Sequence, residues 1–330
     1  MREALYYQPH PTGVQCRLCP KACIIAEGKS GFCRVRQNIN NKLYSHNYAA
    51  CSASALDPIE KKPLFHFYPG RYILSVGTWG CNFSCKFCQN WQIAQDKPEV
   101  IELPPDRLVS LARQQGENNI GIAFTYSEPS VWYEYILDTA IASQAAGLKN
   151  VLVTNGFINP EPLQRLLPYI DALNIDVKAF SEDYYHKICA GRLDDVKQTV
   201  QLAAQSCHVE ITTLIVPDLN DAEEELAALA RWLAGINPAI PLHFSRYYPN
   251  YQLTKAATPI NTMHRAAEVA KTYLQYVYLG NIGTSAINTY CPDCKQLVLN
   301  RITRTSYLMP DKKCPQCGSL IRIVGEVCYS

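Results

Sequence analysis

Residues 71–90 read RYILSVGTWGCNFSCKFCQN. They begin with an apolar, β-branched run typical of a buried strand and continue directly into Cys81, Cys85 and Cys88, a C-x3-C-x2-C array. The array therefore follows the carboxyl end of a predicted strand, which is where parallel α/β folds place their active sites. We expect the chemistry of this protein at this loop.

The chain beyond this loop repeats one pattern, a short apolar run followed by an amphipathic stretch, as far as residue 280. Strands are expected at residues 71–78, 120–126, 150–155, 172–177, 208–215, 241–247 and 276–280. Helices are expected at residues 104–118, 130–147, 160–170, 192–206, 221–235 and 262–275. About six strand–helix units and a closing strand predict a mainly parallel sheet covered by helices. Such a sheet is either open and doubly wound or curled into a full or partial barrel.

The composition is that of a soluble globular protein of 330 residues, of which 48% are hydrophobic and 18% charged. No stretch approaches the roughly 20 uninterrupted apolar residues that cross a bilayer. The first residues show no charged segment leading into an apolar run, so we expect a cytoplasmic protein. Because 31 Lys and Arg balance 29 Asp and Glu, we expect neither a membrane nor a nucleic acid as partner.

Cysteine is the most informative residue type in this chain. An odd count of 15, without an export signal, argues against a disulfide framework and favours metal binding. Residues 1–70 form a Cys-rich region without strand–helix alternation, and residues 284–330 hold short strands around CPDC and CPQCG. We therefore expect a barrel-like body at residues 71–283 between two small cysteine-rich parts.

The three cysteines after the first predicted strand suit an iron–sulfur cluster. Three thiolates on one loop can each bind one iron of a 4Fe-4S cubane and leave the fourth iron without a protein ligand. That open iron would accept a substrate or a cofactor. The alternatives are a zinc site completed by a ligand from elsewhere, or three reduced buried thiols.

With the aromatic Phe87 directly before Cys88, the array resembles the signature of radical S-adenosylmethionine (radical SAM) enzymes. The resemblance implies an α/β fold with a partial (β/α)6 barrel around a 4Fe-4S cluster. Its open iron would bind the amino and carboxylate groups of S-adenosyl-L-methionine (SAM). One-electron reduction would then cleave SAM to methionine and a 5'-deoxyadenosyl radical that abstracts hydrogen from a substrate. A low-potential cluster further implies a reductant protein, a flavodoxin or a ferredoxin.

The resemblance also implies SAM-binding roles for residues that follow the predicted strands. The backbone of Phe87 would lie against the adenine. Tyr126, Ser127 and Glu128 stand where the family has a Gly-Gly-Glu-like turn that receives the methionine amino group. Taken alone, a glutamate before a proline is often only a loop charge.

Three later positions complete the SAM site that the resemblance implies. Asn155 would lie near the ribose or the carboxylate. Asp176 and Lys178 resemble the Asp-x-Lys motif of glycyl-radical activating enzymes, with Lys178 reaching the carboxylate. His243, near the end of a late strand, is expected to face the same pocket. The ordinary structural explanations are a turn for Asn155, a solvated ion pair for Asp176 and Lys178, and a structural role for His243.

Longer stretches of the chain resemble the radical enzymes of the AmmeMemoRadiSam system, relatives of the pyruvate formate-lyase activating enzymes. They include CRLCPKACIIAEGKSGFCRVRQN at residues 16–38, ALDPIEKKPLFHFYPG at residues 55–70 and HFSRYYPNY at residues 243–251. This resemblance implies a pathway or complex shared with Memo-like and AMMECR-like proteins. It implies no established substrate.

Two rival functions are open. In a glycyl-radical enzyme activating enzyme we expect an Asp where this chain has Val153 and an Arg where it has Thr212, so part of that cofactor and cation site is missing. A non-enzymatic zinc-binding assembly module would instead use the cysteines only for structure.

Four cysteines near the C-terminus form two C-x2-C pairs at zinc-ribbon spacing: Cys291, Cys294, Cys314 and Cys317. Four thiolates would saturate a tetrahedral Zn²⁺ ion and fold a small ribbon that has little core of its own. Rubredoxin-like iron is the chemical alternative, because four sulfur ligands suit either metal.

Another four cysteines near the N-terminus form a candidate second metal site: Cys16, Cys19, Cys23 and Cys33. Their spacing suits zinc or another iron–sulfur cluster, and a disulfide pair in an oxidised preparation is a further alternative. The remaining four cysteines are interpreted as ordinary thiols: Cys51, Cys189, Cys207 and Cys328.

Overall fold

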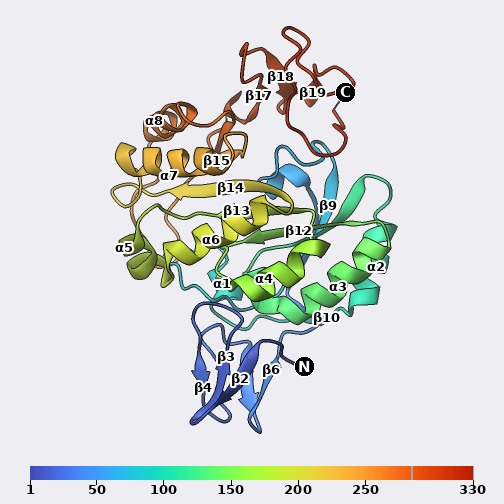
Figure 1. Cartoon of the computed structure of the whole chain (residues 1–330), viewed down its shortest axis with the longest axis vertical. Coiled ribbons are helices and arrows are strands. Elements are labelled where there is room, and N and C mark those ends of the chain that lie inside the picture. Colours follow the sequence, from blue (N-terminus) through green and yellow to red (C-terminus); the bar gives the residue numbers. More distant parts are fainter. Residues whose placement is uncertain (284, 330) are drawn as a thin grey trace.

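The centre of the molecule is an eight-stranded sheet in the order β16-β15-β14-β13-β12-β11-β9-β8 (Figure 1). The computed structural model describes residues 1–283 and 285–329. The strands of this sheet are β8 (Ala53–Pro58), β9 (Tyr72–Gly77), β11 (Asn119–Phe124), β12 (Lys149–Thr154), β13 (Ala172–Asp176), β14 (His208–Ile215), β15 (Leu242–Arg246) and β16 (Val277–Gly280). All neighbours pair in parallel except β8, which is antiparallel to β9. In the described chain the edge strands β16 and β8 do not pair with each other, so the sheet is open.

Helices connect the parallel strands and lie around the outside of the sheet (Figure 1). They are α1 (Trp91–Ala94), α2 (Pro105–Gln114), α3 (Tyr133–Ala145), α4 (Pro160–Leu166), α5 (Glu182–Tyr184), α6 (Leu193–Ala204), α7 (Glu223–Ile236) and α8 (Ile260–Lys271). Short 3-10 segments are η1 (Ile59–Lys61), η2 (Pro129–Trp132), η3 (Leu167–Tyr169) and η5 (Ser285–Ile287), and η4 (Tyr185–Cys189) is a π-helical turn. None of the described helices combines the length and apolar character needed to cross a lipid bilayer.

The predicted strand–helix repetition and the mixed α/β fold class are confirmed. Strand β14 has the predicted bounds, and β16 closes the series after α8. Helices α2 and α4 begin at Pro105 and Pro160, because the fixed φ of proline suits the first helical position. Pro104, the first residue of the helix expected at residues 104–118, instead precedes α2 as its cap.

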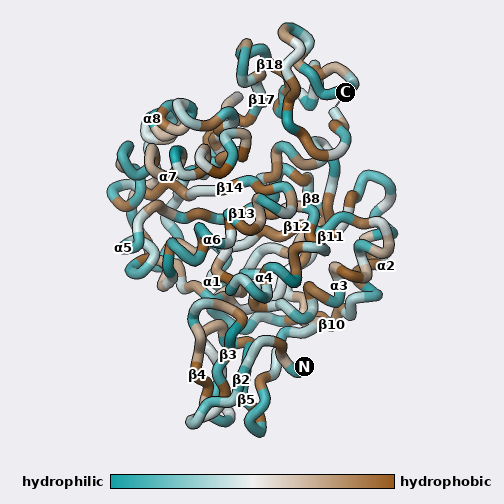
Figure 2. Tube along the Cα trace, viewed as in Figure 1, coloured by the Kyte–Doolittle hydropathy of each residue, from teal (hydrophilic) through white to brown (hydrophobic). Residues whose placement is uncertain are grey.

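The parallel strands of the central sheet are largely buried on both faces, as parallel strands between helices normally are. The antiparallel edge strand β8 instead exposes three of its six residues. In β9 and β11 only one residue of six is even partly exposed. Figure 2 shows apolar stretches gathered around β8, β11 and β12. This continuous burial explains why the strand runs could be read from the sequence.

The two cysteine-rich parts lie at opposite ends of the molecule (Figure 1). The N-terminal part contains small antiparallel sheets built from β1 (Arg2–Glu3), β2 (Tyr7–His10), β3 (Gly13–Cys16), β4 (Ile24–Ile25), β5 (Arg36–Ile39) and β6 (Lys42–Ser45), and β7 (Ala50–Cys51) pairs with β10 (Ile101–Glu102). The C-terminal part contains β17 (Thr289–Tyr290), β18 (Leu297–Asn300) and β19 (Thr305–Ser306). Strand β8, which falls inside the expected N-terminal region, belongs to the central sheet instead. Thr284 and Ser330, the first and last residues of the expected C-terminal part, lie outside the described residues.

Each cysteine-rich part contacts a different edge of the barrel-like body. The N-terminal part lies at the carboxyl ends of the strands, where Asn159, on the loop after β12, donates its backbone N–H to the Leu18 carbonyl at 3.0 Å. The C-terminal part lies at the amino ends, where Phe67, on the loop before β9, forms a β-bridge with Val324. Only the N-terminal part therefore lies near the edge at which active sites form in this kind of fold.

Candidate functional site

The cysteine loop after β9 is fixed by backbone hydrogen bonds to a distant turn. The N–H groups of Ser84 and Lys86 each donate, at 3.0 Å, to carbonyls at the end of η4. The Gln95 side chain donates to the Phe83 carbonyl, also at 3.0 Å. The Phe83 ring in turn packs so closely on Gly191 that a Cβ atom there would lie 2.3 Å from it. The loop is thus held from both sides by other parts of the protein.

A pocket of about 390 Å³ opens at the carboxyl ends of the strands, directly against this loop. It brings together ten of the residues that the sequence singled out: Cys81, Cys85, Phe87, Cys88, Tyr126, Ser127, Glu128, Asn155, Asp176 and Lys178. All fifteen cysteines of the chain are free thiols. Three thiols therefore share a pocket with a carboxylate, an amide and an ammonium group.

The Glu128 side chain organises the floor of the pocket. It is only 3% exposed, and its two oxygens accept hydrogen bonds from the Thr154 hydroxyl at 2.7 Å and from the Asn155 and Ser130 backbone N–H groups at 2.8 Å. Burial raises the pKa of Glu128, and these hydrogen bonds oppose the rise. Both carboxylate oxygens are thus engaged in joining the ends of β11 and β12.

The turn that carries Glu128 has an unusual backbone. Tyr126 adopts φ 68°, in the left-handed region that normally favours glycine. The Tyr126 carbonyl accepts from the Asn90 side chain at 2.6 Å, and the Ser127 hydroxyl donates to the Thr78 carbonyl at 2.8 Å. This non-glycine turn therefore has the backbone of a glycine turn and is tied to the loop that carries the cysteines.

Asn155 links the pocket floor to the first cysteine. Its side-chain amide donates to the Asn82 side-chain oxygen at 2.9 Å and lies 3.8 Å from the Cys81 sulfur. Burial raises the pKa of Cys81, and burial raises the pKa of Cys88 to about 11. These thiols must therefore lose their protons when a metal binds, because thiolates are the ligating form.

Asp176 and Lys178, at the end of the neighbouring strand β13, form an ion pair at 2.8 Å. Burial opposes the charge on Lys178, but the Asp176 carboxylate outweighs burial and raises its pKa. The ammonium group lies 5.8 Å from the centre of the Phe87 ring. The pocket thus holds a fixed positive charge beside the aromatic residue of the cysteine array.

His243 does not line this pocket, which corrects the expectation from the sequence. It is the second residue of β15, and its Nε2 lies 2.6 Å from a carboxylate oxygen of the buried Glu210. Ser245, two residues further along the strand, does line the pocket. Alternate residues of a strand share a face, so His243 lies on the same face of β15 as the pocket residue Ser245, as predicted. It lies below the pocket, however, and not in its wall.

Two pocket residues, Lys61 and Lys62, come from a segment that the sequence did not connect with the site. Lys62 and Asp57 form a 2.8 Å ion pair, and the Tyr126 hydroxyl donates to Asp57 at 3.1 Å. Burial raises the pKa of Asp57, but Lys62 and Tyr126 outweigh it and lower the value to about 2. Lys62 lines the pocket together with Lys61. No spacing signal connected them with the cysteines, because β8 and η1 precede the array.

Val153 and Thr212, the two departures from the activating-enzyme pattern, also line the pocket. The pocket wall thus differs from the activating-enzyme pattern at two positions.

Cys189, interpreted from the sequence as an ordinary thiol, lies next to the array. The Cys189 thiol raises the pKa of Cys85, and burial adds to the rise. A fourth thiol thus lies behind the array.

The four C-terminal cysteines converge on one point. Their sulfur atoms all lie within 4.8 Å of one another, with Cys291 and Cys317 at 3.5 Å and Cys294 and Cys314 at 3.6 Å. Four thiolates at about 2.3 Å from a tetrahedral zinc stand about 3.8 Å apart, so the donor set fits a single ion. Within residues 1–283 and 285–329 this is the one group of three or more His, Cys, Asp or Glu side chains so tightly gathered.

The four N-terminal cysteines also come together, around a cavity of about 20 Å³. Cys16 and Cys33 are buried, whereas Cys19 and Cys23 are partly exposed. The expected second metal site is thus a spatial cluster, although a more open one than the C-terminal group.

Comparison with known proteins gives the family. Residues 76–230 match the Radical SAM superfamily. The chain is 42% identical to MJ0808, an uncharacterized protein of Methanocaldococcus jannaschii, over 98% of this chain and all of that protein. MJ1632 of the same organism, named as a candidate glycyl-radical enzyme activating enzyme, is 26% identical over 62% of this chain and 79% of its own length.

Two solved structures share the fold. Streptococcus suis SuiB bound to S-adenosylmethionine superposes with a TM-score of 0.51 at 14% identity, over 64% of this chain and 52% of SuiB. A radical SAM methyltransferase from Sphaerobacter thermophilus superposes with a TM-score of 0.52 at 15% identity, over 67% of this chain and 70% of that one. The chain thus spans about half the length of SuiB. Residues 76–230 therefore form a radical SAM superfamily domain.

Proposed function

We propose that this protein binds a 4Fe-4S cluster through Cys81, Cys85 and Cys88 and cleaves SAM reductively at the open iron. The cluster supplies the electron that breaks SAM into methionine and a 5'-deoxyadenosyl radical, which abstracts hydrogen from a substrate of unknown identity. One observation carries the proposal: three free thiols converge on a pocket at the carboxyl ends of the strands, as the family requires.

In this proposal the chain orients SAM with fixed polar groups. Lys178 holds the carboxylate of the methionine part, and Asn155 lies near the ribose or this carboxylate. The main chain of the turn at Tyr126 and Ser127 receives the amino group, because the Glu128 oxygens already accept hydrogen bonds from the protein. The backbone of Phe87 lies against the adenine.

The direct test is low-temperature EPR of anaerobically purified, dithionite-reduced protein with and without SAM, combined with measurement of 5'-deoxyadenosine. We expect a reduced 4Fe-4S signal that changes shape when SAM is added, and 5'-deoxyadenosine that forms only under reducing conditions. A fully reconstituted sample whose EPR signal does not change on addition of SAM would overturn the proposal.

Lys178→Ala is expected to weaken SAM binding by about 10- to 100-fold, because a charge-assisted hydrogen bond contributes about 1.5–3 kcal/mol. Iron content should stay unchanged, since Lys178 is not a ligand. Equilibrium binding of SAM to the reconstituted protein measures the effect. Lys187→Ala is the matched control, because Lys187 also pairs with an aspartate but is exposed. Equal SAM affinity in the two variants would remove Lys178 from the site.

We also propose that the chain belongs to the AmmeMemoRadiSam subfamily and works with Memo-like and AMMECR-like proteins, with a flavodoxin or ferredoxin as reductant. The sequence stretches at residues 16–38 and 55–70 support this assignment. Affinity purification under anaerobic conditions, followed by mass spectrometry against both protein classes, tests it. Recovery of neither class would count against the shared pathway.

Activation of a glycyl-radical enzyme is the second candidate, favoured by the similarity to MJ1632. Val153 and Thr212 in the pocket weigh against it, because an Asp and an Arg are expected there. A glycyl EPR doublet on a partner enzyme after mixing under reducing conditions would make it the better candidate.

For the C-terminal cysteines we propose a structural zinc ion. Cys314→Ser is expected to lose about one zinc per chain and to make residues 288–329 sensitive to protease, because this part has only a small apolar core. Metal analysis and limited proteolysis measure both effects. Cys207→Ser, outside all three cysteine clusters, should keep the zinc. Iron in place of zinc would favour the rubredoxin-like alternative.

A further inference from the structure

We infer that Cys16, Cys19, Cys23 and Cys33 ligate a second iron–sulfur cluster, a cubane with four protein ligands, which passes electrons to the cluster site at Cys81, Cys85 and Cys88. The existence of this site depends only on the N-terminal residues. Its role as an electron relay rests on the proposed function.

The four thiols form one site because a short fold brings them together. Cys16 ends β3, and its backbone N–H donates to the Cys23 carbonyl at 2.9 Å across the turn that carries Cys19. The Phe32 backbone N–H donates to the Cys23 sulfur at 3.4 Å, which brings the segment before Cys33 to the same point. All four line the cavity of about 20 Å³, and none is in a disulfide.

The spacing of the sulfur atoms favours a cluster over a single ion. At the C-terminal site the sulfurs are drawn within 4.8 Å of one another, as one tetrahedral ion requires. Among the described residues, neither the N-terminal cysteines nor the cysteines of the central array form a group of that kind. A cubane needs the wider arrangement, because each thiolate binds a different iron at a different corner. The N-terminal site thus resembles the central array in this respect.

A buried cation faces the same cavity and has hydrogen-bonding capacity to spare. Arg36 is 1% exposed, lines the cavity, and places its Nη1 3.9 Å from the Cys16 sulfur. Its Nη2 pairs with the buried Glu134, whereas its Nε has no partner among the described residues. Hydrogen-bond donors to sulfur stabilise an anionic cluster and tune its reduction potential. A cluster in this cavity would therefore give the buried Arg36 a function.

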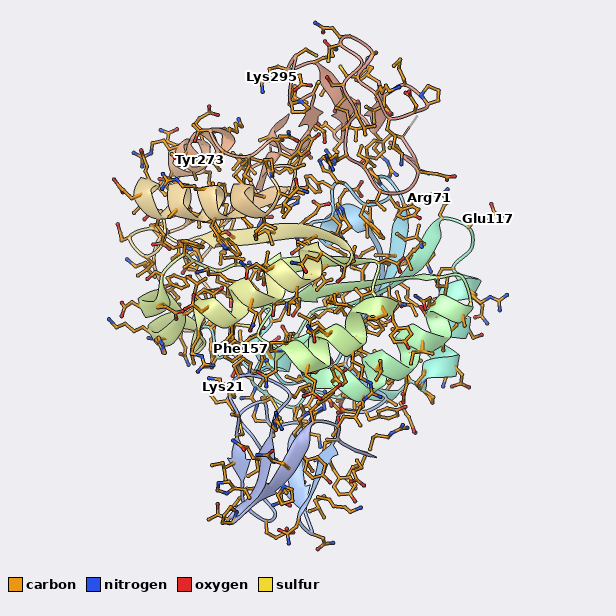
Figure 3. All side chains as sticks on the ribbon, viewed as in Figure 1. Lys21, Arg71, Glu117, Phe157, Tyr273 and Lys295 are labelled. Atoms are coloured by element: carbon orange, nitrogen blue, oxygen red, sulfur yellow. The ribbon has the colours of Figure 1, made fainter. Side chains whose placement is uncertain are left out.

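The two cysteine sites share a wall that is one residue thick. Cys81 lines the SAM pocket, and the next residue, Asn82, lines the N-terminal cavity. Gly80, with φ 88°, lies so close that a Cβ atom there would meet the Cys33 carbonyl oxygen at 2.7 Å. Lys21, at the junction of the N-terminal part and the barrel in Figure 3, also lines the cavity. The geometry therefore permits direct electron transfer between the sites.

The proposed function gives the direction of transfer, because the cluster at which SAM is cleaved consumes the electron. Cys19 and Cys23 are partly exposed, so the N-terminal site can meet a soluble donor. A reduced flavodoxin or ferredoxin gives one electron and is itself oxidised by one electron; the N-terminal cluster goes from the 2+ to the 1+ state. The same electron then reduces the second cluster from 2+ to 1+ and returns the first to 2+. No proton moves and no bond is made or broken.

Iron, sulfide and zinc analysis of four reconstituted proteins tests the inference. Wild type should hold about eight irons and eight sulfides, and the triple variant Cys81→Ala/Cys85→Ala/Cys88→Ala should keep about four of each. Cys19→Ala/Cys23→Ala should keep about four irons with an EPR signal that responds to SAM. Cys207→Ala is the control and should keep about eight. Because the triple variant leaves the N-terminal part intact, the test does not depend on the folding of the N-terminal variant.

Other outcomes separate the two proposals. The second cluster is overturned, and the proposed function stands, if wild type holds only about four irons and the triple variant holds none. The same conclusion follows if the N-terminal cysteines retain zinc in place of iron. Iron retained in the triple variant, with no signal in any protein that responds to SAM, overturns the proposed function and leaves the second cluster standing.

The relay has its own readout. Rapid mixing with reduced flavodoxin, followed by freeze-quench EPR, should show the SAM-responsive cluster reduced in a fast phase in wild type. Cys19→Ala/Cys23→Ala should lose the fast phase, although a long incubation with dithionite should still reduce its remaining cluster. A fast phase of unchanged rate in that variant would overturn the relay.

Discussion

Cys85→Ala is expected to lose about four of the irons in this protein and all measurable 5'-deoxyadenosine formation. The reason is geometric. In the proposed function Cys85 is the middle ligand of the array, and a cubane held by only two protein thiolates on one loop would have lost one of its three anchors. Loss of a group behind the metal ligands already lowers metal affinity or activity by about 10- to 100-fold, so loss of a ligand itself should exceed that range.

Cys189→Ala is the matched control for this prediction. Cys189 is a buried thiol close enough to Cys85 to raise its pKa, yet it does not line the SAM pocket. We expect it to keep its iron and its SAM-dependent EPR change. Iron analysis and single-turnover measurement of 5'-deoxyadenosine on Cys85→Ala and Cys189→Ala test both expectations. If Cys189→Ala also loses the iron, the ligand set of the array has been misassigned.

The sequence predicted those parts of the site that are local in the chain. The cysteine array follows directly from β9, and Asn155 and Asp176 lie at or just after the ends of strands whose apolar runs are easily recognised. Because parallel strands bring their carboxyl ends to one edge, a correct strand order places these residues together without any knowledge of packing.

The sequence could not predict how deep a side chain lies within the barrel, or which strands distant in the chain pair with each other. Lys62 lines the pocket, and its ion-pair partner Asp57 is placed beside it only because β8 adds antiparallel to the edge of a parallel sheet. No periodicity in the sequence indicates that pairing. In β14, Glu210, Thr212 and Leu214 share one face by strand alternation. Only the last two line the pocket, since Glu210 lies deeper.

The buried hydrogen bonds around Glu210, below the pocket, support the second prediction with a large expected effect. Glu210 is fully buried and accepts four hydrogen bonds, from the backbone N–H groups of Phe65 and His66 at 2.9 and 2.7 Å and from His208 and His243 at 2.9 and 2.6 Å. Burial raises the pKa of Glu210, but the two histidines outweigh it and hold the pKa well below its usual range. A charged carboxylate is thus the common partner of two strands and the loop before β9.

Glu210→Ala is expected to lower the free energy of unfolding by about 3–5 kcal/mol, because removing one partner of a buried charged network leaves the others unsatisfied. The urea midpoint of the cluster-free protein measures this effect. Glu268→Ala, which removes an exposed carboxylate paired with Lys271, is the control and should change stability by about 0.5 kcal/mol or less.

The pH dependence distinguishes a charge effect from a simple cavity. A carboxyl whose folded pKa is depressed contributes stability above its unfolded pKa of about 4.3, and that contribution is lost as the pH falls below it. The difference between wild type and Glu210→Ala should therefore shrink as the pH falls below about 4.3. Amide exchange at Phe65 and His66 should also accelerate in the variant, since both N–H groups lose their acceptor. If Glu210→Ala instead left stability unchanged and weakened SAM binding, this layer would belong to the active site, and the original expectation for His243 would be restored.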